Sequence, residues 1–257
     1  MRVVSWNVNS LGVRMDRVTE WIESLQPDVL CLQETKMADD AFPHEVFSNL
    51  GYESAHHGQG QWNGVAIISR VGLDDVRADF ADGRPDADPY ARILWATCNV
   101  VSVATCYVPN GRSLDDDHYT YKLDWLDRLA GDLDQNTSPT DDLCVVGDFN
   151  IAPDDRDVYD PKKLVNMTHT SAAEREKLAA LDSWGISDLF RQHHDEAGLY
   201  SWWDYRNGDF HKRRGMRIDL ILGSSSVAER THRIFVDRNA RKGKQPSDHA
   251  PVVADLS

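Results

Sequence analysis

The strongest constraint on the fold is the alternation of short β-branched runs with amphipathic helical patterns. Apolar runs bounded by turn residues predict buried strands at residues 2–6, 28–33, 64–69, 93–108, 143–148, 217–223 and 250–256, and the run 93–108 is long enough for two strands. Helical spacing of apolar side chains predicts helices at residues 14–25, 119–133 and 171–184. Ser171 and Glu174 form a capping-box pattern at the start of the third. The alternation, with some strands consecutive, predicts an α/β fold with a mixed sheet.

The bulk properties are those of an ordinary globular protein with an uneven charge distribution. The 257 residues contain no repeat or obvious linker, so we expect one domain spanning residues 1–257. The formal charge of −14 argues against a polyanionic partner. However, residues 211–217 and 238–244 each carry four cations and no acid. An isolated basic run is usually a solvated loop, but both runs flank candidate chemistry and therefore indicate contact with a polyanion.

The cysteines and the N-terminus bear on the cellular compartment. No Cys-x-x-Cys pair occurs, and each cysteine sits within a predicted strand, which favours buried thiols over zinc or disulfides; the four are Cys31, Cys98, Cys106 and Cys144. No signal-peptide pattern follows Met1, and the apolar runs are too short to cross a bilayer. We therefore expect a soluble protein of the reducing cytoplasm, with no membrane partner.

Polar side chains gather where the predicted strands end. In α/β folds such positions hold ligand and catalytic sites, because loops there carry side chains on a rigid frame. Any one of these residues could be a simple turn former. Taken together they indicate a site, and they are Asn7, Asn9, Glu34, Tyr107, Asn110, Asp148, Asn150, Asp248 and His249.

Asp219 is the most informative carboxylate, because it lies inside an apolar strand between Ile218 and Leu220. Burying a carboxylate is costly unless it is paired. Asp219 therefore needs a donor, and His249 is a good candidate. In this interpretation the distant Asp219, and not the adjacent Asp248, orients the imidazole. The alternative, in which Asp248 caps the turn beside His249, stays open.

Six segments carry a resemblance to a known family. "SWNVNSL", "LQETK", "GDFNIAP", "YSWWDYR", "RGMRIDLIL" and "PSDHAPV" resemble the signature blocks of the exonuclease III family of abasic-site endonucleases, within the exonuclease–endonuclease–phosphatase superfamily. They run in the family's order from residue 5 to residue 253. The resemblance implies a four-layer α/β sandwich, in which two mixed sheets pack face to face between helices.

The resemblance also implies a function in base excision repair. The expected enzyme is a Mg²⁺-dependent hydrolase, with Mn²⁺ as a substitute, that cuts duplex DNA 5′ to abasic sites. It would also have 3′→5′ exodeoxyribonuclease and 3′-phosphatase or phosphodiesterase activity. The expected partner is duplex DNA with abasic sites or 3′ ends, bound by a monomer. The alternatives are a phosphatase or phosphodiesterase acting on RNA or small phosphoesters, and a non-catalytic DNA-binding protein.

Residue roles follow from the same resemblance. The implied metal ligands are led by Glu34, with Asn7, Asp148, Asn150, Asp248 and His249. His249, oriented by Asp219, would donate to the scissile phosphate, and Asp148 would activate water or protonate the leaving oxygen. Tyr107 resembles a tyrosine that contacts the phosphate, although it could be an ordinary strand-end aromatic. Further contacts to substrate phosphates are implied for Asn9, Lys36, Asn110 and Asn150.

The DNA-binding surface is expected in the segments 200–206 and 211–217. Trp202 and Trp203 offer stacking surface, although one or both could be core aromatics. Met216 stands where family members often have an aromatic wedge. Contacts to backbone phosphates are expected from Lys212, Arg213, Arg214 and Arg217, and from the window 238–244.

Overall fold

The computed structural model describes all residues from 1 to 257, and its frame is a pair of six-stranded sheets. The first sheet has the order β11-β12-β1-β2-β4-β3. Only β1 and β2 are parallel in it, so it is mixed. Its strands are β1 (Arg2–Asn7), β2 (Val29–Gln33), β3 (Glu53–His57), β4 (Val65–Ser69), β11 (Thr231–Val236) and β12 (Val252–Leu256).

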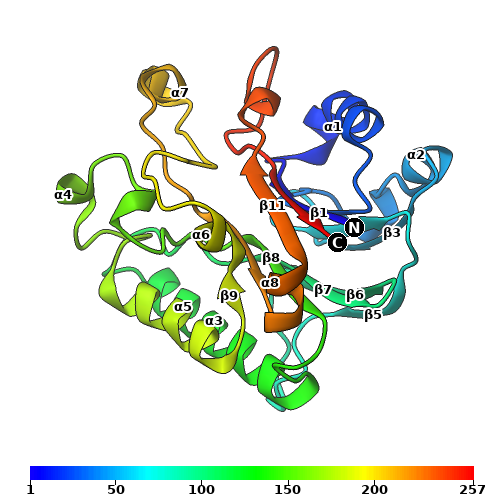
Figure 1. The fold of residues 1–257 in the computed structure, drawn as a ribbon, viewed down its shortest axis with the longest axis horizontal. Coiled ribbons are helices and arrows are strands. Elements are labelled where there is room, and N and C mark those ends of the chain that lie inside the picture. Colours follow the sequence, from blue (N-terminus) through cyan, green and yellow to red (C-terminus); the bar gives the residue numbers. More distant parts are fainter.

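The second sheet has the order β5-β6-β7-β8-β10-β9 and is mixed in the same way, with β7 and β8 as its parallel pair. Its strands are β5 (Asp74–Ala78), β6 (Ile93–Cys98), β7 (Val101–Tyr107), β8 (Leu143–Asp148), β9 (Ser187–Asp188) and β10 (Asp219–Gly223). Figure 1 shows the two sheets stacked one above the other, with both chain termini beside β1.

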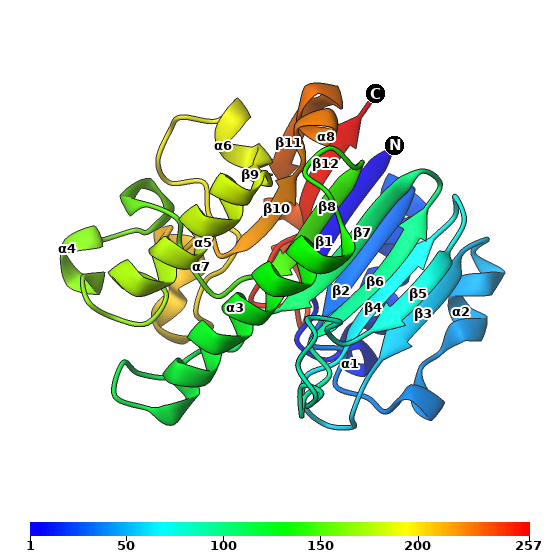
Figure 2. The ribbon, with the colours of Figure 1, turned by 90° about the horizontal axis from the view of Figure 1, so that it is seen from below.

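Three buried clusters bind the layers together. The central one joins both sheets and includes Val29 and Ile67 from the first and Val103 and Val146 from the second. A second cluster lies beneath α3 (Asp117–Asn136) and α5 (Ala172–Trp184). A third lies beneath α1 (Leu11–Leu25) and α2 (His44–Asn49). Figure 1 shows the resulting four layers from the side, with α3 and α5 outside one sheet and α1 and α2 outside the other, and Figure 2 shows α3 crossing in front of the strands. The expected four-layer α/β sandwich is therefore confirmed.

The remaining helices are short and lie in the connections. They are α4 (Pro161–Leu164), α6 (Leu189–His193), α7 (Asp209–Lys212) and α8 (Ser225–Arg230). Helix α5 begins with the predicted capping box, because Ser171 Oγ accepts from the Glu174 N–H and the Glu174 carboxylate accepts from the Ser171 N–H. None of the helices has both the length and the apolar character that crossing a bilayer requires.

The sequence patterns missed four strands, β3, β5, β9 and β11. All four are the outermost strands of a sheet, and β9 spans only two residues. Edge strands bury fewer side chains, so β3 (ESAHH) and β5 (DDVRA) lack the apolar runs that mark a central strand. The four cysteines are free and buried, as expected.

Candidate active site

The carboxyl ends of β1, β2 and β8 meet at one edge of the sandwich. Asn7, the last residue of β1, donates from Nδ2 to Glu34 Oε1 and to Asp148 Oδ2, both at 2.9 Å. Asn7 and Asp148 are buried, and Glu34 is partly exposed. Glu34 follows β2 directly with a left-handed φ of 53°, which turns the chain away at the strand end. One amide therefore holds together carboxylates that are 114 residues apart in the chain (148 − 34).

The predicted pairing of Asp219 with His249 is confirmed. Asp219 Oδ2 lies 2.8 Å from His249 Nδ1, and both side chains are buried. His249 Nε2 points the other way and lies 3.7 Å from Asp148 Oδ2. Ser201 Oγ accepts from the backbone N–H of Asp219 at 3.1 Å, which fixes the strand that carries the acid. The imidazole is thus braced on one side and faces Asp148 on the other.

The turn beside the histidine is capped by Ser247 and not by Asp248. The His249 N–H donates to Ser247 Oγ at 3.2 Å, and that hydroxyl donates to the carbonyl of Asn7 at 2.7 Å. Asp248 instead accepts from Asn9 Nδ2 at 2.9 Å and from Trp202 Nε1 at 3.1 Å. The interpretation that Asp219 orients the imidazole therefore stands, and Asp248 joins the site to the loop at residue 202.

Crowded carboxylates shift the protonation of this centre. Burial disfavours the imidazolium, but the charges of Asp219 and Asp148 outweigh it and raise the pKa of His249 to about 10. Burial raises the pKa of Asp148 to about 7, and the nearby Asp219 and Glu34 charges act in the same direction. The centre thus holds more negative charge than its own cations balance.

Three side chains form a group that could hold a metal ion. Glu34, Asp148 and His249 each offer a ligand atom, and these atoms lie within 4.8 Å of one another. Lys36 Nζ contacts Glu34 Oε2 at 2.8 Å and Asn9 Oδ1 at 2.5 Å. Asp248 lies outside this group.

Neutral donors line the next part of the site. The Asn150 N–H donates to Asp148 Oδ1 at 2.9 Å, and Asn110 Nδ2 donates to Asn150 Oδ1 at 3.1 Å. Tyr107 ends β7 opposite Asp148 in the strand register. Burial and the Glu34 charge raise the pKa of Tyr107 well above its usual range, so its hydroxyl stays a donor at neutral pH.

The sequence patterns did not reveal the buried side chains that hold these two asparagines in place. Lys122 Nζ lies 2.5 Å from Glu174 Oε1 and donates to the carbonyls of Asn150 at 2.7 Å and Asn110 at 3.3 Å. His169 Nε2 lies 3.3 Å from Asn110 Nδ2, and its Nδ1 is buried without a partner. A lysine beside the leucines of a predicted helix gives no signal of such a role.

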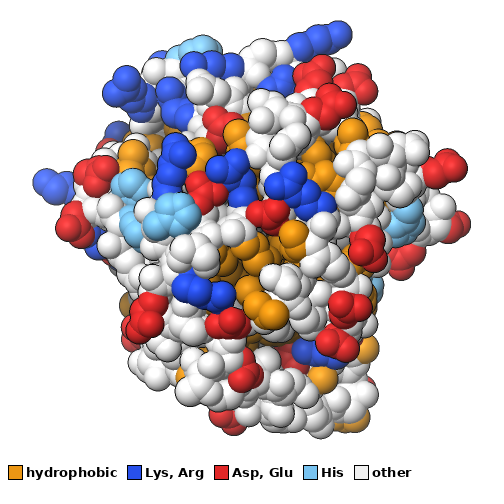
Figure 3. All heavy atoms as spheres, turned by 45° about the vertical axis from the view of Figure 1, so that its right-hand side comes forward, with side chains coloured by type: hydrophobic (Ala, Val, Ile, Leu, Met, Phe, Trp, Pro, Cys, Tyr) orange, Lys and Arg blue, Asp and Glu red, His pale blue; other side chains and the backbone are white.

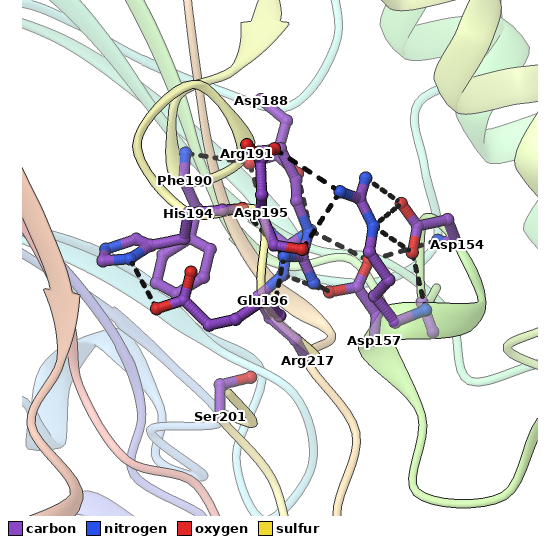
Figure 4. A network of polar contacts seen from close by, with 12 residues as sticks. Asp154, Asp157, Asp188, Phe190, Arg191, His194, Asp195, Glu196, Ser201 and Arg217 are labelled. Atoms are coloured by element: carbon purple, nitrogen blue, oxygen red, sulfur yellow. Dashed lines mark hydrogen bonds and ion pairs between the residues drawn. The ribbon is translucent and has the colours of Figure 1, made fainter. Parts of the chain in front are cut away.

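The prediction that Arg217 contacts DNA is wrong. Its side chain is 0% exposed, its Nε lies 2.6 Å from Asp157 Oδ1, and its Nη2 lies 2.7 Å from Asp188 Oδ2. Figure 4 shows this network, in which Arg191 also contacts Asp157. Arg217 therefore joins the loop before β10 to two other segments and is unavailable to a ligand.

Two of the apolar DNA-contact predictions are also wrong. Trp203 is 2% exposed and packs edge-on against Phe210 at 5.1 Å between ring centres, so it is the core aromatic of the alternative. Met216 is buried with Val158 and Ile218 and cannot act as a wedge. Trp202 remains partly exposed beside Asp248.

The cations that do reach solvent lie on loops around the site. In the first window they are Lys212, Arg213 and Arg214. In the second, Lys242 and Lys244 are exposed, whereas Arg241 is buried against Tyr205 and Phe210. Figure 1 shows α7 and the loop 238–244 projecting at the top of the view, with α1 beside that loop. Figure 3 shows Lys and Arg side chains gathered on the upper part of one face and acidic side chains mostly below and at its margins.

Comparisons with known proteins agree with this geometry. The model of the endonuclease/exonuclease/phosphatase family matches residues 4–249. The chain is 34% identical to exodeoxyribonuclease III of Haemophilus influenzae, over 100% of both chains. It resembles the structure of the Neisseria 3′ phosphatase NExo bound to a product DNA hairpin, with a TM-score of 0.95, 38% identity, and coverage of 100% and 99%. An AP endonuclease structure from Archaeoglobus fulgidus has the same TM-score and coverage at 33% identity.

Proposed function

The chain belongs to the endonuclease/exonuclease/phosphatase family, and we propose that it is a metal-dependent DNA-repair phosphodiesterase that cuts duplex DNA 5′ to abasic sites and processes 3′ ends. It is a hydrolase of the exodeoxyribonuclease III kind, because the identity to that enzyme extends over the whole of both chains. The relatives include both a 3′ phosphatase and an AP endonuclease, so both activities are proposed here.

The observation that carries the proposal is the convergence of Glu34, Asp148 and the His249–Asp219 pair on one buried edge. Hydrolysis of a phosphodiester requires a positioned proton donor, a group that activates water, and compensation of the charge on the phosphoryl oxygens. His249 Nε2, held by Asp219 at Nδ1, would donate to the scissile phosphate. Asn110, Asn150 and Tyr107 supply neutral donors to the same oxygens.

Asp148 is the proposed proton-transfer group. It accepts from Asn7 and from the Asn150 N–H, so its position is fixed. Burial raises the pKa of Asp148 above its usual range, which suits a group that takes a proton from water or gives one to the leaving oxygen. The position of the carboxylate is compatible with accepting a proton from water and with protonating the leaving oxygen, since it faces His249 Nε2, the group proposed to contact the phosphate.

The donor set fits a divalent cation. The group of Glu34, Asp148 and His249 is rich in oxygen, and the raised pKa of Asp148 indicates negative charge that a cation would compensate. Glu34 and Asp148 would hold the ion, and Asn7, Asn150, Asp248 and His249 lie around them. Mg²⁺ is the proposed ion and Mn²⁺ its substitute; the ion would polarise the phosphoryl group and compensate charge on its oxygens.

DNA binding is proposed for the exposed loop cations. Lys212, Arg213 and Arg214 would contact backbone phosphates, and Trp202 would lie close to the cut strand. Since every residue of the site comes from one chain, we further propose that the monomer is active. Gel filtration of the active enzyme at assay concentration tests that point, and activity confined to a dimer peak contradicts it.

The direct test is a panel of defined substrates. It contains an abasic-site duplex, a 3′-recessed duplex, a 3′-phosphate duplex and p-nitrophenyl phosphate, each with Mg²⁺ and with EDTA. We expect Mg²⁺-dependent cleavage of the DNA substrates only. Asp148→Asn, which keeps size and removes proton transfer, should lower turnover at least about a hundredfold. Cleavage of p-nitrophenyl phosphate alone favours a small-phosphoester enzyme, and binding of DNA without any cleavage favours a non-catalytic protein.

A further inference from the structure

A pocket of about 380 Å³ opens beside the candidate active site. Two site residues, Tyr107 and Asn110, form part of its wall, so a ligand in the pocket lies next to the phosphate-binding donors. The rest of the wall includes Trp62, Tyr90, Arg92 and Arg112. No acidic side chain lines the pocket, although the chain as a whole carries a charge of −14.

Arg92 is the unusual member of this wall. It is only 5% exposed, yet no carboxylate forms an ion pair with its guanidinium. Its side chain makes one hydrogen bond within the protein, from Nη1 to the carbonyl of Tyr107 at 3.0 Å, and its Nε is buried without a partner. A buried cation without a counter-ion is costly. The fully buried Arg217 has two carboxylates instead.

Aromatic rings surround the guanidinium and keep it at the pocket. Arg92 Cζ lies 4.7 Å from the ring centre of Tyr107 and 5.5 Å from that of Tyr90. Cation–π contacts of this kind stabilise a guanidinium without neutralising it. Gln59 Oε1 accepts from the Ala91 N–H at 2.6 Å and from Asn63 Nδ2 at 3.1 Å, so it ties the loop of Trp62 to the segment of Arg92. The pocket is therefore a built feature whose cation has no direct ion-pair partner, although burial raises the pKa of the nearby Asp88 carboxylate and the charge of Arg92 acts against that rise.

The outer wall offers stacking surface. Trp62 is 65% exposed, which is high for a tryptophan, and Tyr90 is 38% exposed. Arg112 is exposed as well, and its contact with Asp116 is a long one of 3.8 Å. Exposed aromatic faces beside free cations are the combination that holds single-stranded nucleic acid, through base stacking and phosphate contacts.

We propose that this pocket, here termed the Arg92 pocket, is a nucleotide subsite that flanks the cleavage site. Arg92 and Arg112 bind the phosphate next to the scissile one, and Trp62 and Tyr90 stack on the base of that nucleotide. Because a paired base is already stacked within the duplex, the occupant is an unpaired nucleotide of the cut strand. The inference rests on the proposed function and adds a preference for substrates that are mismatched or frayed next to the cut.

The test compares two duplexes in EDTA, where binding is measured without cleavage. One is fully paired, and the other has a mismatch on each side of the scissile bond. We expect Trp62→Ala to weaken binding of the mismatched duplex roughly tenfold, within the usual range for loss of a stacked base, and to change binding of the paired duplex less than about twofold. Trp62→Phe retains a ring and should behave like the wild type. Equal effects of Trp62→Ala on both duplexes, or none on either, overturn the proposal.

The phosphate contact is tested separately. Arg112→Ala should reduce by about one the slope of log binding constant against log salt concentration. Arg70 follows β4 at the end that lies away from Trp62, so Arg70→Ala should leave that slope unchanged. Arg92→Met removes the unpaired charge and keeps the volume. It should weaken binding about fivefold or more with little change in melting temperature. A large drop in melting temperature with unchanged binding would make Arg92 a structural residue and overturn its assignment.

A spectroscopic readout locates the occupant. 2-Aminopurine placed in turn on either side of the scissile bond should show stacking-dependent quenching at one of the two positions on binding, and Trp62→Ala should abolish that change. Identical signals from the wild type and Trp62→Ala at both positions contradict the subsite. If these tests fail while the wild type cleaves the DNA panel, the subsite alone is wrong. If the wild type cleaves no DNA, the proposed function is wrong.

Discussion

The buried Lys122–Glu174 pair offers a sharp test of how the site is supported. Both side chains are 0% exposed, and the Nζ–Oε1 distance is 2.5 Å. Lys122 also holds the carbonyls of Asn110 and Asn150, so it links helices α3 and α5 to both asparagines of the proposed phosphate site. Removing one partner of a buried pair leaves the other charge uncompensated, at a cost of about 3–5 kcal/mol.

We expect Glu174→Gln to lower the free energy of unfolding by at least about 3 kcal/mol, because glutamine keeps only one of the two oxygens that accept separately from the N–H groups of His169 and Ser171. That cost would shift the urea midpoint by about 1 M for an m-value near 3 kcal/mol/M. Lys122→Met should cost a similar amount. The double variant, which removes both charges, should lose at least about 2 kcal/mol less than the sum of the two single losses.

The pair Lys177–Asp127 is the matched control. It joins the same two helices at 2.6 Å, but its side chains are 29% and 52% exposed. Lys177→Met and Asp127→Asn should each cost less than about 1 kcal/mol. Turnover of the folded Glu174→Gln protein should also fall, by roughly tenfold, since Lys122, which holds the carbonyls of Asn110 and Asn150, loses the carboxylate that positions it. A cost below about 1 kcal/mol for Glu174→Gln, or full additivity with Lys122→Met, refutes the reasoning.

Four further outcomes follow from the same structure. Burial alone would raise the pKa of Glu174, but Lys122 and the surrounding donors lower it below its usual value. The difference in unfolding free energy between the wild type and Glu174→Gln, measured by urea titration, should therefore be at its maximum above about pH 5 and become smaller below about pH 4. A difference that does not change with pH would contradict this. Asp219→Ala should lower turnover roughly a hundredfold and destabilise the fold by about 1–3 kcal/mol, and wild-type behaviour in both assays would dismiss the His249 pair. Arg217→Met should cost about 3 kcal/mol and leave the salt dependence of DNA binding unchanged, whereas a lower salt slope would return Arg217 to the DNA surface. Joint replacement of Lys212, Arg213 and Arg214 by Ala should lower the salt slope by about one for each phosphate that the loop no longer neutralises, without changing the melting temperature, and an unchanged slope would place this loop away from DNA.

The sequence was informative where local chemistry forces one solution. Central strands can be recognised in the sequence as apolar β-branched runs, because both of their faces are buried. A carboxylate at position 219, within such a run, had to find a buried donor, and His249 was the candidate that the structure bears out. The edge strands β3 and β5 carried no such signal, since their side chains are largely exposed or only partly buried.

Pairings across the chain could not be read from local patterns. Arg217 stands in the same basic run as Arg213 and Arg214, but its partners Asp157 and Asp188 lie 60 and 29 residues away. A run of cations looks the same whether it faces solvent or distant acids. Lys122 and Glu174 are 52 residues apart, and nothing in the sequence shows that Arg92 is buried without an ion-pair partner. These features depend on how the layers pack, and the packing cannot be deduced from residue types and their spacing along the chain.

The central claim is that Glu34 and Asp148, beside the imidazole of His249, form one cation-binding centre for DNA hydrolysis. Anomalous diffraction from crystals soaked in Mn²⁺ tests it most directly. The account predicts a single strong peak among the three side chains in the wild type and its loss in Glu34→Gln, together with loss of Mn²⁺-dependent cleavage. A peak elsewhere in the wild type, or full cleavage by Glu34→Gln without a peak at this centre, would contradict it.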